Sequence, residues 1–271
     1  MNLELIIKYI EQQGTKEDRA RLWHLLRRVN IRSTPFFQKF LDLQNPDGGW
    51  PFKFQQRSPS TISDTFSAIS RLLEWDAVEP AYTRMITPFI LRLQRWDGSW
   101  EENPAIQKLE SMTWMQSTAL ERSLLATARA CTALTFLGYW GESALNGLNF
   151  LVSHLQEEGW IKEHQLISGI ALSSFLLLKS PIFEPTLEIS NILLNTIDTI
   201  EEISWLAEIM KGLYMAHVPK SDPLVDKCLK VLKQAQQSDG GWKANRKKET
   251  SVKVTLSIIA VLKYYAILPE Y

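Results

Sequence analysis

Asp64 is the first residue of this sequence to consider for chemistry. It lies in the stretch Thr61-Ile62-Ser63-Asp64-Thr65, which follows a polar loop and begins a predicted helix. A carboxyl group there could donate a proton if its neighbours tune its pKa. The structural alternative is a capping box, because Thr61 precedes Asp64 by three residues. Capping is the better supported role on sequence alone. The two roles are compatible, however, and Asp64 is the residue that we predict to be catalytic.

Two other polar residues are candidates for binding a substrate. Glu208 lies inside a predicted helix, and in an internal cavity it would have to be paired, solvated or neutral, because an isolated buried charge is costly. His164 directly precedes another predicted helix, where it could polarise an acid or stabilise charge. The alternative for His164 is an ordinary surface histidine.

Three tryptophans complete the predicted binding set. Aromatic faces attract cations, so Trp205, Trp114 and Trp23 could line a cavity in which positive charge develops. The alternative for each is plain packing in a hydrophobic core, which needs no ligand.

The composition restricts the remaining possibilities. The 271 residues are 45% hydrophobic, and 30 basic residues balance 30 acidic ones, so the field expected of a nucleic-acid binder is absent. The uncharged run over 166–178 is too short to span a bilayer. A peripheral membrane contact is compatible with the composition but not signalled by it. The sequence does not specify an oligomeric state.

The two cysteines, Cys131 and Cys228, both lie in apolar helical stretches. They read as buried free thiols, which fits a cytoplasmic protein in a reducing compartment. The sequence holds no D-D-x-x-D run, no phosphate-binding Gly loop and no G-x-S-x-G elbow. We therefore expect no metal and no cofactor.

Four segments share a Gln, a polar turn with Gly, and a Trp. We call each a clasp; they end at Trp50, Trp100, Trp160 and Trp242. Repeats of this kind indicate one structural unit used several times. Glycine allows the positive φ that ends a helix, so the Trp can fold back onto the helix it follows. The Gln amide would bind frayed backbone groups or lie against the ring.

Helical periodicity and breakers predict about twelve helices and no convincing strand. In most pairs the first helix is short and mixed in polarity, and the second is richer in small and apolar residues. Six outer and six inner helices would close into a single all-α (α/α)6 toroid, or barrel, over residues 1–271. The predicted ranges are 2–13, 16–30, 33–43, 61–76, 80–93, 116–137, 142–157, 164–178, 185–197, 200–217, 222–237 and 248–267.

The clasps resemble the QW motifs of squalene–hopene and oxidosqualene cyclases. The segment QNPDGGWPF…SPSTISDTFSAISRL also resembles repeats of protein prenyltransferase β-subunits. The resemblance covers nearly the whole chain, although those cyclases carry two such barrels and this chain has room for one. It implies an isoprenoid ligand in the lumen, and either cyclisation or prenyl transfer.

The chain departs from the family at the acid. Class II terpenoid cyclases carry D-x-D-D followed by Thr, and here only Asp64 and Thr65 match, with Ser63 at the position of the proton donor. The D-x-C zinc arrangement of farnesyltransferases is also absent, because neither cysteine follows an Asp by two residues. A non-catalytic binding module for a hydrophobic or prenyl ligand, or a scaffold for a partner protein, therefore remains an alternative.

Overall fold

The computed structural model describes residues 2–108, 118–154, 165–178, 183–200, 202–244 and 250–268. Regular structure in these ranges is almost entirely helical, so the predicted all-α class is confirmed. The helices are α1 (Leu3–Gln13), α2 (Lys16–Leu25), α3 (Pro35–Leu41), α4 (Ile62–Glu74), α5 (Pro80–Thr83), α6 (Ile86–Arg92), α7 (Ala119–Phe136), α8 (Glu142–Ser153), α9 (Gln165–Leu178), α10 (Phe183–Thr196), α11 (Ile203–Met215), α12 (Pro223–Gln234) and α13 (Ser251–Tyr264).

One prediction about these elements was wrong. The helix expected over 80–93 is divided into α5 and α6, because Pro88 cannot donate a backbone hydrogen bond and therefore occupies the first turn of a new helix. The chain also contains two short antiparallel strands, β1 (Trp50–Pro51) and β2 (Ser60–Thr61), which pair Trp50 with Thr61. They are two residues each, too short to show any alternation in the sequence.

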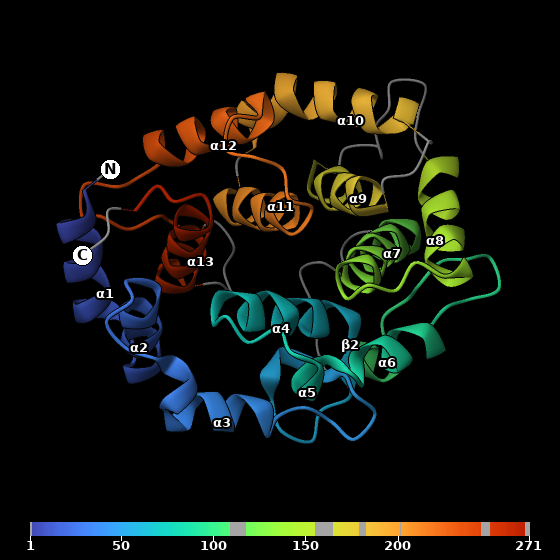
Figure 1. Cartoon of the computed structure of the whole chain (residues 1–271), viewed down its shortest axis with the longest axis horizontal. Coiled ribbons are helices and arrows are strands. Elements are labelled where there is room, and N and C mark those ends of the chain that lie inside the picture. Colours follow the sequence, from blue (N-terminus) through green and yellow to red (C-terminus); the bar gives the residue numbers. More distant parts are fainter. Residues whose placement is uncertain are drawn as a thin grey trace.

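The helices are arranged in two sets (Figure 1). Helices α1, α3, α6, α8, α10 and α12 lie on the periphery, and α4, α7, α9, α11 and α13 lie nearer the centre. The central helices contact one another in chain order, α4 with α7, α7 with α9, α9 with α11 and α11 with α13. Helix α13 then contacts α2 and α1, so the end of the chain packs against its beginning.

The three described clasps share one hydrogen-bond pattern. The Gln side-chain amide donates to the carbonyl of the turn glycine, at 2.9 Å from Gln44 to Gly48 and at 3.0 Å from Gln236 to Gly240. Gln94 makes the same bond. The prediction that Gln satisfies free backbone groups is therefore confirmed for these clasps, and the clasp over 156–160 lies outside the described residues.

Each described clasp is also bound to the helix that follows it. The backbone N–H of the clasp Trp donates to a threonine hydroxyl, and all three indoles are buried. This bond joins a peripheral helix to its central neighbour at a point where water cannot reach the donor. The pairs are Trp50 with Thr65 at 2.9 Å, Trp100 with Thr127 at 2.9 Å, and Trp242 with Thr255 at 3.0 Å.

The last clasp joins the two ends of the chain. Gly240 has φ +95°, and a Cβ atom there would lie 2.4 Å from the carbonyl carbon of Leu5 in α1. The amide oxygen of Gln236 accepts a hydrogen bond of 3.2 Å from the backbone N–H of Asn2. Glycine is required at this position both by the backbone conformation and by the close approach.

Candidate functional site

Thr61 caps the N-terminus of α4 and holds Asp64 in place. The hydroxyl of Thr61 accepts a 2.9 Å hydrogen bond from the backbone N–H of Asp64 and donates a 2.7 Å bond to its carboxylate. The N-cap is therefore confirmed, but the carboxylate binds the threonine hydroxyl rather than the backbone N–H of a full capping box.

Burial raises the pKa of Asp64 above its ordinary value. Hydrogen bonds from the Thr61 hydroxyl and the Lys53 backbone N–H oppose this shift, and so does the positive charge of Arg129. Because the burial effect is larger, the acid holds its proton to a higher pH than an exposed aspartate does. Asp64 is half-buried at the start of α4.

Glu102 binds the same helix end from a neighbouring loop. Its carboxylate accepts 2.8 Å hydrogen bonds from the backbone N–H groups of Ile62 and Ser63, and it also accepts from the Ser63 hydroxyl. A helix N-terminus favours such an anion. Burial nevertheless raises the pKa of Glu102, because the hydrogen bonds from Ser63 and Ile62 offset only part of the desolvation.

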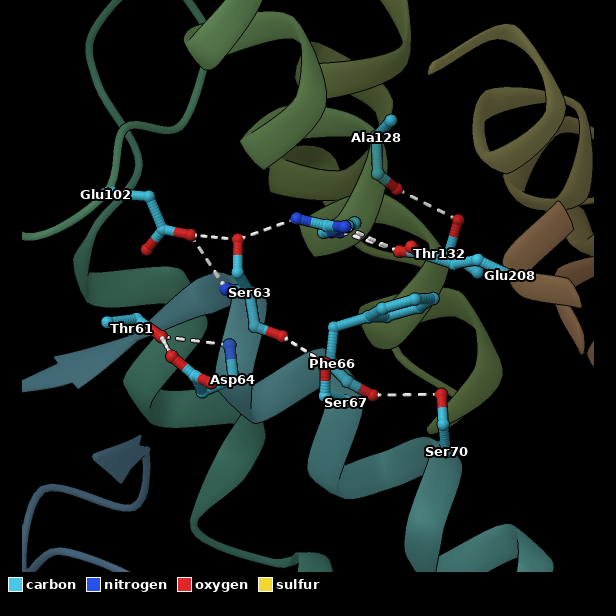
Figure 2. A network of polar contacts seen from close by, with 11 residues as sticks. Thr61, Ser63, Asp64, Phe66, Ser67, Ser70, Glu102, Ala128, Thr132 and Glu208 are labelled. Carbon is cyan, nitrogen blue, oxygen red and sulfur yellow. Dashed lines mark hydrogen bonds and ion pairs between the residues drawn. The ribbon is translucent and has the colours of Figure 1, made fainter. Parts of the chain in front are cut away.

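Arg129 of α7 extends this arrangement to α11 (Figure 2). Its guanidinium donates a 2.8 Å hydrogen bond to the Ser63 hydroxyl and bonds of 2.9 and 2.7 Å to Glu208. The network Glu102–Ser63–Arg129–Glu208 therefore joins a loop and three central helices. Figure 2 shows Asp64 beside Thr61, and Ser63 between Glu102 and the guanidinium that binds Glu208.

A second group of charges lies toward the other end of α4. Glu74 is fully buried and forms an ion pair with Arg21 of α2. The Nε and Nη2 groups of Arg21 each donate a hydrogen bond to one carboxylate oxygen of Glu74, and the bond from Nη2 is 2.7 Å long. Burial alone would raise the pKa of Glu74, but the charge and hydrogen bonds of Arg21 outweigh it and hold this pKa below its ordinary value. Arg71 and Lys211 lie within electrostatic range of this pair.

The predicted site residues have different surroundings in the described structure. Glu208 is paired with Arg129, as a charge within the fold requires. Asp64 of α4 is bound by Thr61, and the charge of Arg129 acts on it over a longer range. Trp205 precedes Glu208 by one turn and is half-buried. Trp23 lies beneath the guanidinium of Arg28, whose central carbon is 5.1 Å from the ring centroid.

Two predicted residues cannot be compared in this way. Trp114 and His164 lie outside the described residues.

Sequence reasoning missed Glu102 and Arg129. Glu102 lies in a loop, far along the chain from Asp64. Arg129 is the only charged residue in the run Ser123–Phe136 of α7, which is otherwise small and apolar. The isolated charge in this apolar run was the available signal, because an arginine in the interior of a central helix needs a partner. Glu121, by contrast, closes a capping box with Thr118.

Neither a cluster of metal-binding side chains nor a helix able to cross a membrane occurs in the ranges that the structure describes. No group of three His, Cys, Asp or Glu side chains there is arranged to hold an ion. None of the helices described combines the length and hydropathy needed to cross a bilayer. Cys131 and Cys228 are both buried and unbonded to each other, as predicted.

Comparison with known proteins gives a likeness of fold. No family model and no curated protein matches the sequence. A crystal structure of a protein from Actinoplanes is similar over 97% of this chain and 98% of that chain, with a TM-score of 0.61 and 13% sequence identity. At this identity the likeness concerns the fold alone.

Proposed function

We propose that this chain is a single-domain α/α toroid of the squalene-cyclase and prenyltransferase type, acting on an isoprenoid substrate in its lumen with Asp64 as the acid. The toroid assignment is supported by the order of helix contacts, which returns from α13 to α2 and α1. It is also supported by clasps with a common hydrogen-bond pattern. A class II cyclase or isomerase begins its reaction by protonating an alkene or epoxide.

The observation that carries the proposal is the state of Asp64. It is half-buried beside a network that reaches α7 and α11, and burial raises its pKa. A carboxyl group in this condition is a better proton reservoir near neutral pH than an exposed aspartate. Trp205 and Glu208, on the neighbouring α11, would contact the bound substrate.

A product assay tests this function. The purified chain is incubated with squalene and with a set of prenyl diphosphates, and extracts are analysed by gas chromatography–mass spectrometry. We expect a cyclised or transferred product that Asp64→Asn abolishes, because the amide keeps the shape of the side chain but cannot donate a proton to an alkene.

Asp18 supplies a matched control. Its carboxylate accepts a 2.8 Å hydrogen bond from the Thr15 hydroxyl at the start of α2, as Asp64 does from Thr61 at the start of α4. Asp18→Asn should therefore keep full activity. Product that persists in Asp64→Asn contradicts the role of Asp64, and no product from any substrate contradicts the enzyme.

A non-catalytic binding toroid is the second candidate. Ser63 stands where the resemblance places the proton donor, and its hydroxyl is held between Glu102 and Arg129. A binding protein needs no acid at that position. Quenching of tryptophan fluorescence by a prenyl alcohol, lost in Trp205→Phe and unaccompanied by any product, would favour this role over the enzyme. Failure of both binding and turnover would leave the scaffold alternative.

A further inference from the structure

A groove lies between the turn of the second clasp, which ends at Trp100, and the peripheral helix α8. Its volume is about 340 Å³, at the small end of the range for ligand sites. The residues that line it include Trp96 and Asp97 of the turn and Asn146, Asn149, Phe150 and Ser153 of α8. All of these except Phe150 are exposed, so a ligand reaches the groove directly from solvent.

Trp96 is almost completely exposed, at 94% of its surface, although contact between an indole and water is unfavourable. The same turn is made without an aromatic residue in the other two described clasps, where Pro46 and Ser238 take this place. The fold therefore does not require an indole at the tip of the turn. The shared hydrogen bond runs from the residue after the Gln to the fourth residue beyond it, from Asn45 to Gly49 at 2.9 Å, from Arg95 to Ser99 at 2.8 Å and from Gln237 to Gly241 at 2.9 Å.

The helices that pack against the first two clasp turns can be aligned with each other. A Cβ atom on Gly48 would meet the carbonyl of Met85 beside α6, and one on Gly98 would meet the carbonyl of Asn146 in α8. Met85 and Asn146 therefore occupy matching positions. Counting forward by the same number of residues, Arg92 of α6 matches Ser153 of α8.

This pair of residues leaves the second turn open. Arg92 reaches from α6 to Asp47 of the first clasp, with 3.6 Å between Nη2 and Oδ2. Ser153 is short and uncharged, and α8 contains no Lys or Arg that could bridge to Asp97 in the same way. The carboxylate of Asp97 instead accepts hydrogen bonds of 3.0 and 2.7 Å from the backbone N–H and the hydroxyl of Ser99.

Neutral polar groups face the open space. Asn146 and Asn149 lie about one turn apart on α8, and neither carboxamide is hydrogen-bonded to another residue in the described part of the chain. Each carboxamide offers two N–H donors and a carbonyl acceptor. The hydroxyl of Ser153 donates to the Phe150 carbonyl at 2.9 Å and can still accept a hydrogen bond.

We propose that this groove binds a neutral sugar, with one pyranose ring of an oligosaccharide stacked on Trp96. The face of a pyranose ring carries C–H groups, whose slight positive charge suits the negative face of an indole. Its edge carries hydroxyl groups, which donate and accept as the carboxamides do. An anion would be repelled by Asp97, and a cation would meet the N–H donors of the two asparagines.

An NMR titration of the ¹⁵N-labelled chain tests the inference. Cellotetraose, maltotetraose and chitotetraose are added separately, and the indole signal of Trp96 is assigned from its absence in Trp96→Ala. We expect at least one of the sugars to shift this signal, with a Kd on the order of 1 mM, because few ligand atoms are held in an open groove. Choline is added in the same way, to test for a cation site.

Three variants locate the binding, measured by isothermal titration calorimetry. Trp96→Ala should weaken it about tenfold, because an exposed tryptophan at the centre of a contact contributes much of the affinity. Trp140→Ala is the control and should bind normally, since Trp140 is 62% exposed but is not among the described residues that line the groove. Ser153→Arg places a cation opposite Asp97, as Arg92 stands opposite Asp47, and should abolish binding.

The inference is independent of the proposed acid chemistry, so Asp64→Asn should bind the sugar as the unaltered chain does. A Trp96 signal that none of the three sugars shifts would overturn the inference. So would equal sugar affinity in Trp96→Ala and the unaltered chain, or a shift with choline alone.

Discussion

Arg129 donates a 2.8 Å hydrogen bond to the hydroxyl of Ser63, and so ties α7 to the first turn of α4. The same guanidinium holds Glu208 of α11, so three central helices meet at one side chain. Both side chains of the ion pair are largely buried, with exposed fractions of 14% for Arg129 and 26% for Glu208. A charge that positions three helices also fixes where Glu102 and Asp64 stand relative to α11.

The first prediction concerns this ion pair. Arg129→Met removes two hydrogen bonds from Glu208, and we expect a loss of about 1.5–3 kcal/mol in the free energy of unfolding, because hydrogen bonds to charged groups lie in that range. The double variant Arg129→Met with Glu208→Gln should recover part of this loss. Urea denaturation measures both. Additive costs of the two single changes would contradict a coupled pair.

The second prediction concerns the threonine that receives the clasp. Thr127→Val keeps the shape of the side chain but leaves the buried backbone N–H of Trp100 without its acceptor. We expect a cost of about 1–3 kcal/mol, the penalty for an unsatisfied buried donor. Thr127→Ser is the control, since it retains the hydroxyl. Equal denaturation midpoints for Thr127→Val and Thr127→Ser would show that this bond contributes nothing.

The sequence predicted the helices well because their signals are local. The clasp repeat and the apolar periodicity placed nearly every helix end within a few residues, and the glycines located the turns. The division of α5 from α6 could also have been inferred, because Pro88 was visible in the sequence. The threonine acceptors were missed because a buried Thr in an apolar helix looks like ordinary core.

The site was less predictable for a different reason. Asp64 and Glu208 were proposed from local signals, but their neighbours come from distant parts of the chain. Glu102 reaches α4 from a loop, and Arg129 reaches Ser63 across 66 positions. Such contacts depend on how the helices pack, and neither spacing nor composition contains that information.

The third prediction separates two of the clasp tryptophans. The indole N–H of Trp100 donates to the carbonyl of Ile90 at 2.7 Å, whereas that of Trp50 has no acceptor in the described part of the chain. Trp100→Phe should therefore cost about 1 kcal/mol more than Trp50→Phe, the usual net value of one hydrogen bond. Thermal and urea denaturation of both variants give the difference. A larger cost for Trp50→Phe would contradict this assignment.

The fourth prediction concerns the buried pair of Glu74 and Arg21. Glu74→Gln removes the partner of a buried guanidinium, and we expect a loss of about 3–5 kcal/mol at pH 7. Glu17→Gln is the control, since Glu17 is half-exposed and lies 3.7 Å from Arg71. It should cost little, because exposed ion pairs contribute little.

The pH dependence of the same variant follows from the direction of the shift. Arg21 holds the pKa of Glu74 below its ordinary value of 4.5, so the folded state releases this proton more readily than the unfolded state does. The stabilisation is therefore present above pH 4.5 and is lost as the pH falls through the lower folded-state pKa. The Glu74→Gln variant lacks this stabilisation at every pH. The difference in unfolding free energy between the wild-type protein and this variant should therefore narrow on acidification below pH 4.5. Urea denaturation at several pH values between 3 and 7 measures this gap, in which the other titrating groups cancel. A gap that is constant with pH would mean that Glu74 is not ionised in the folded chain.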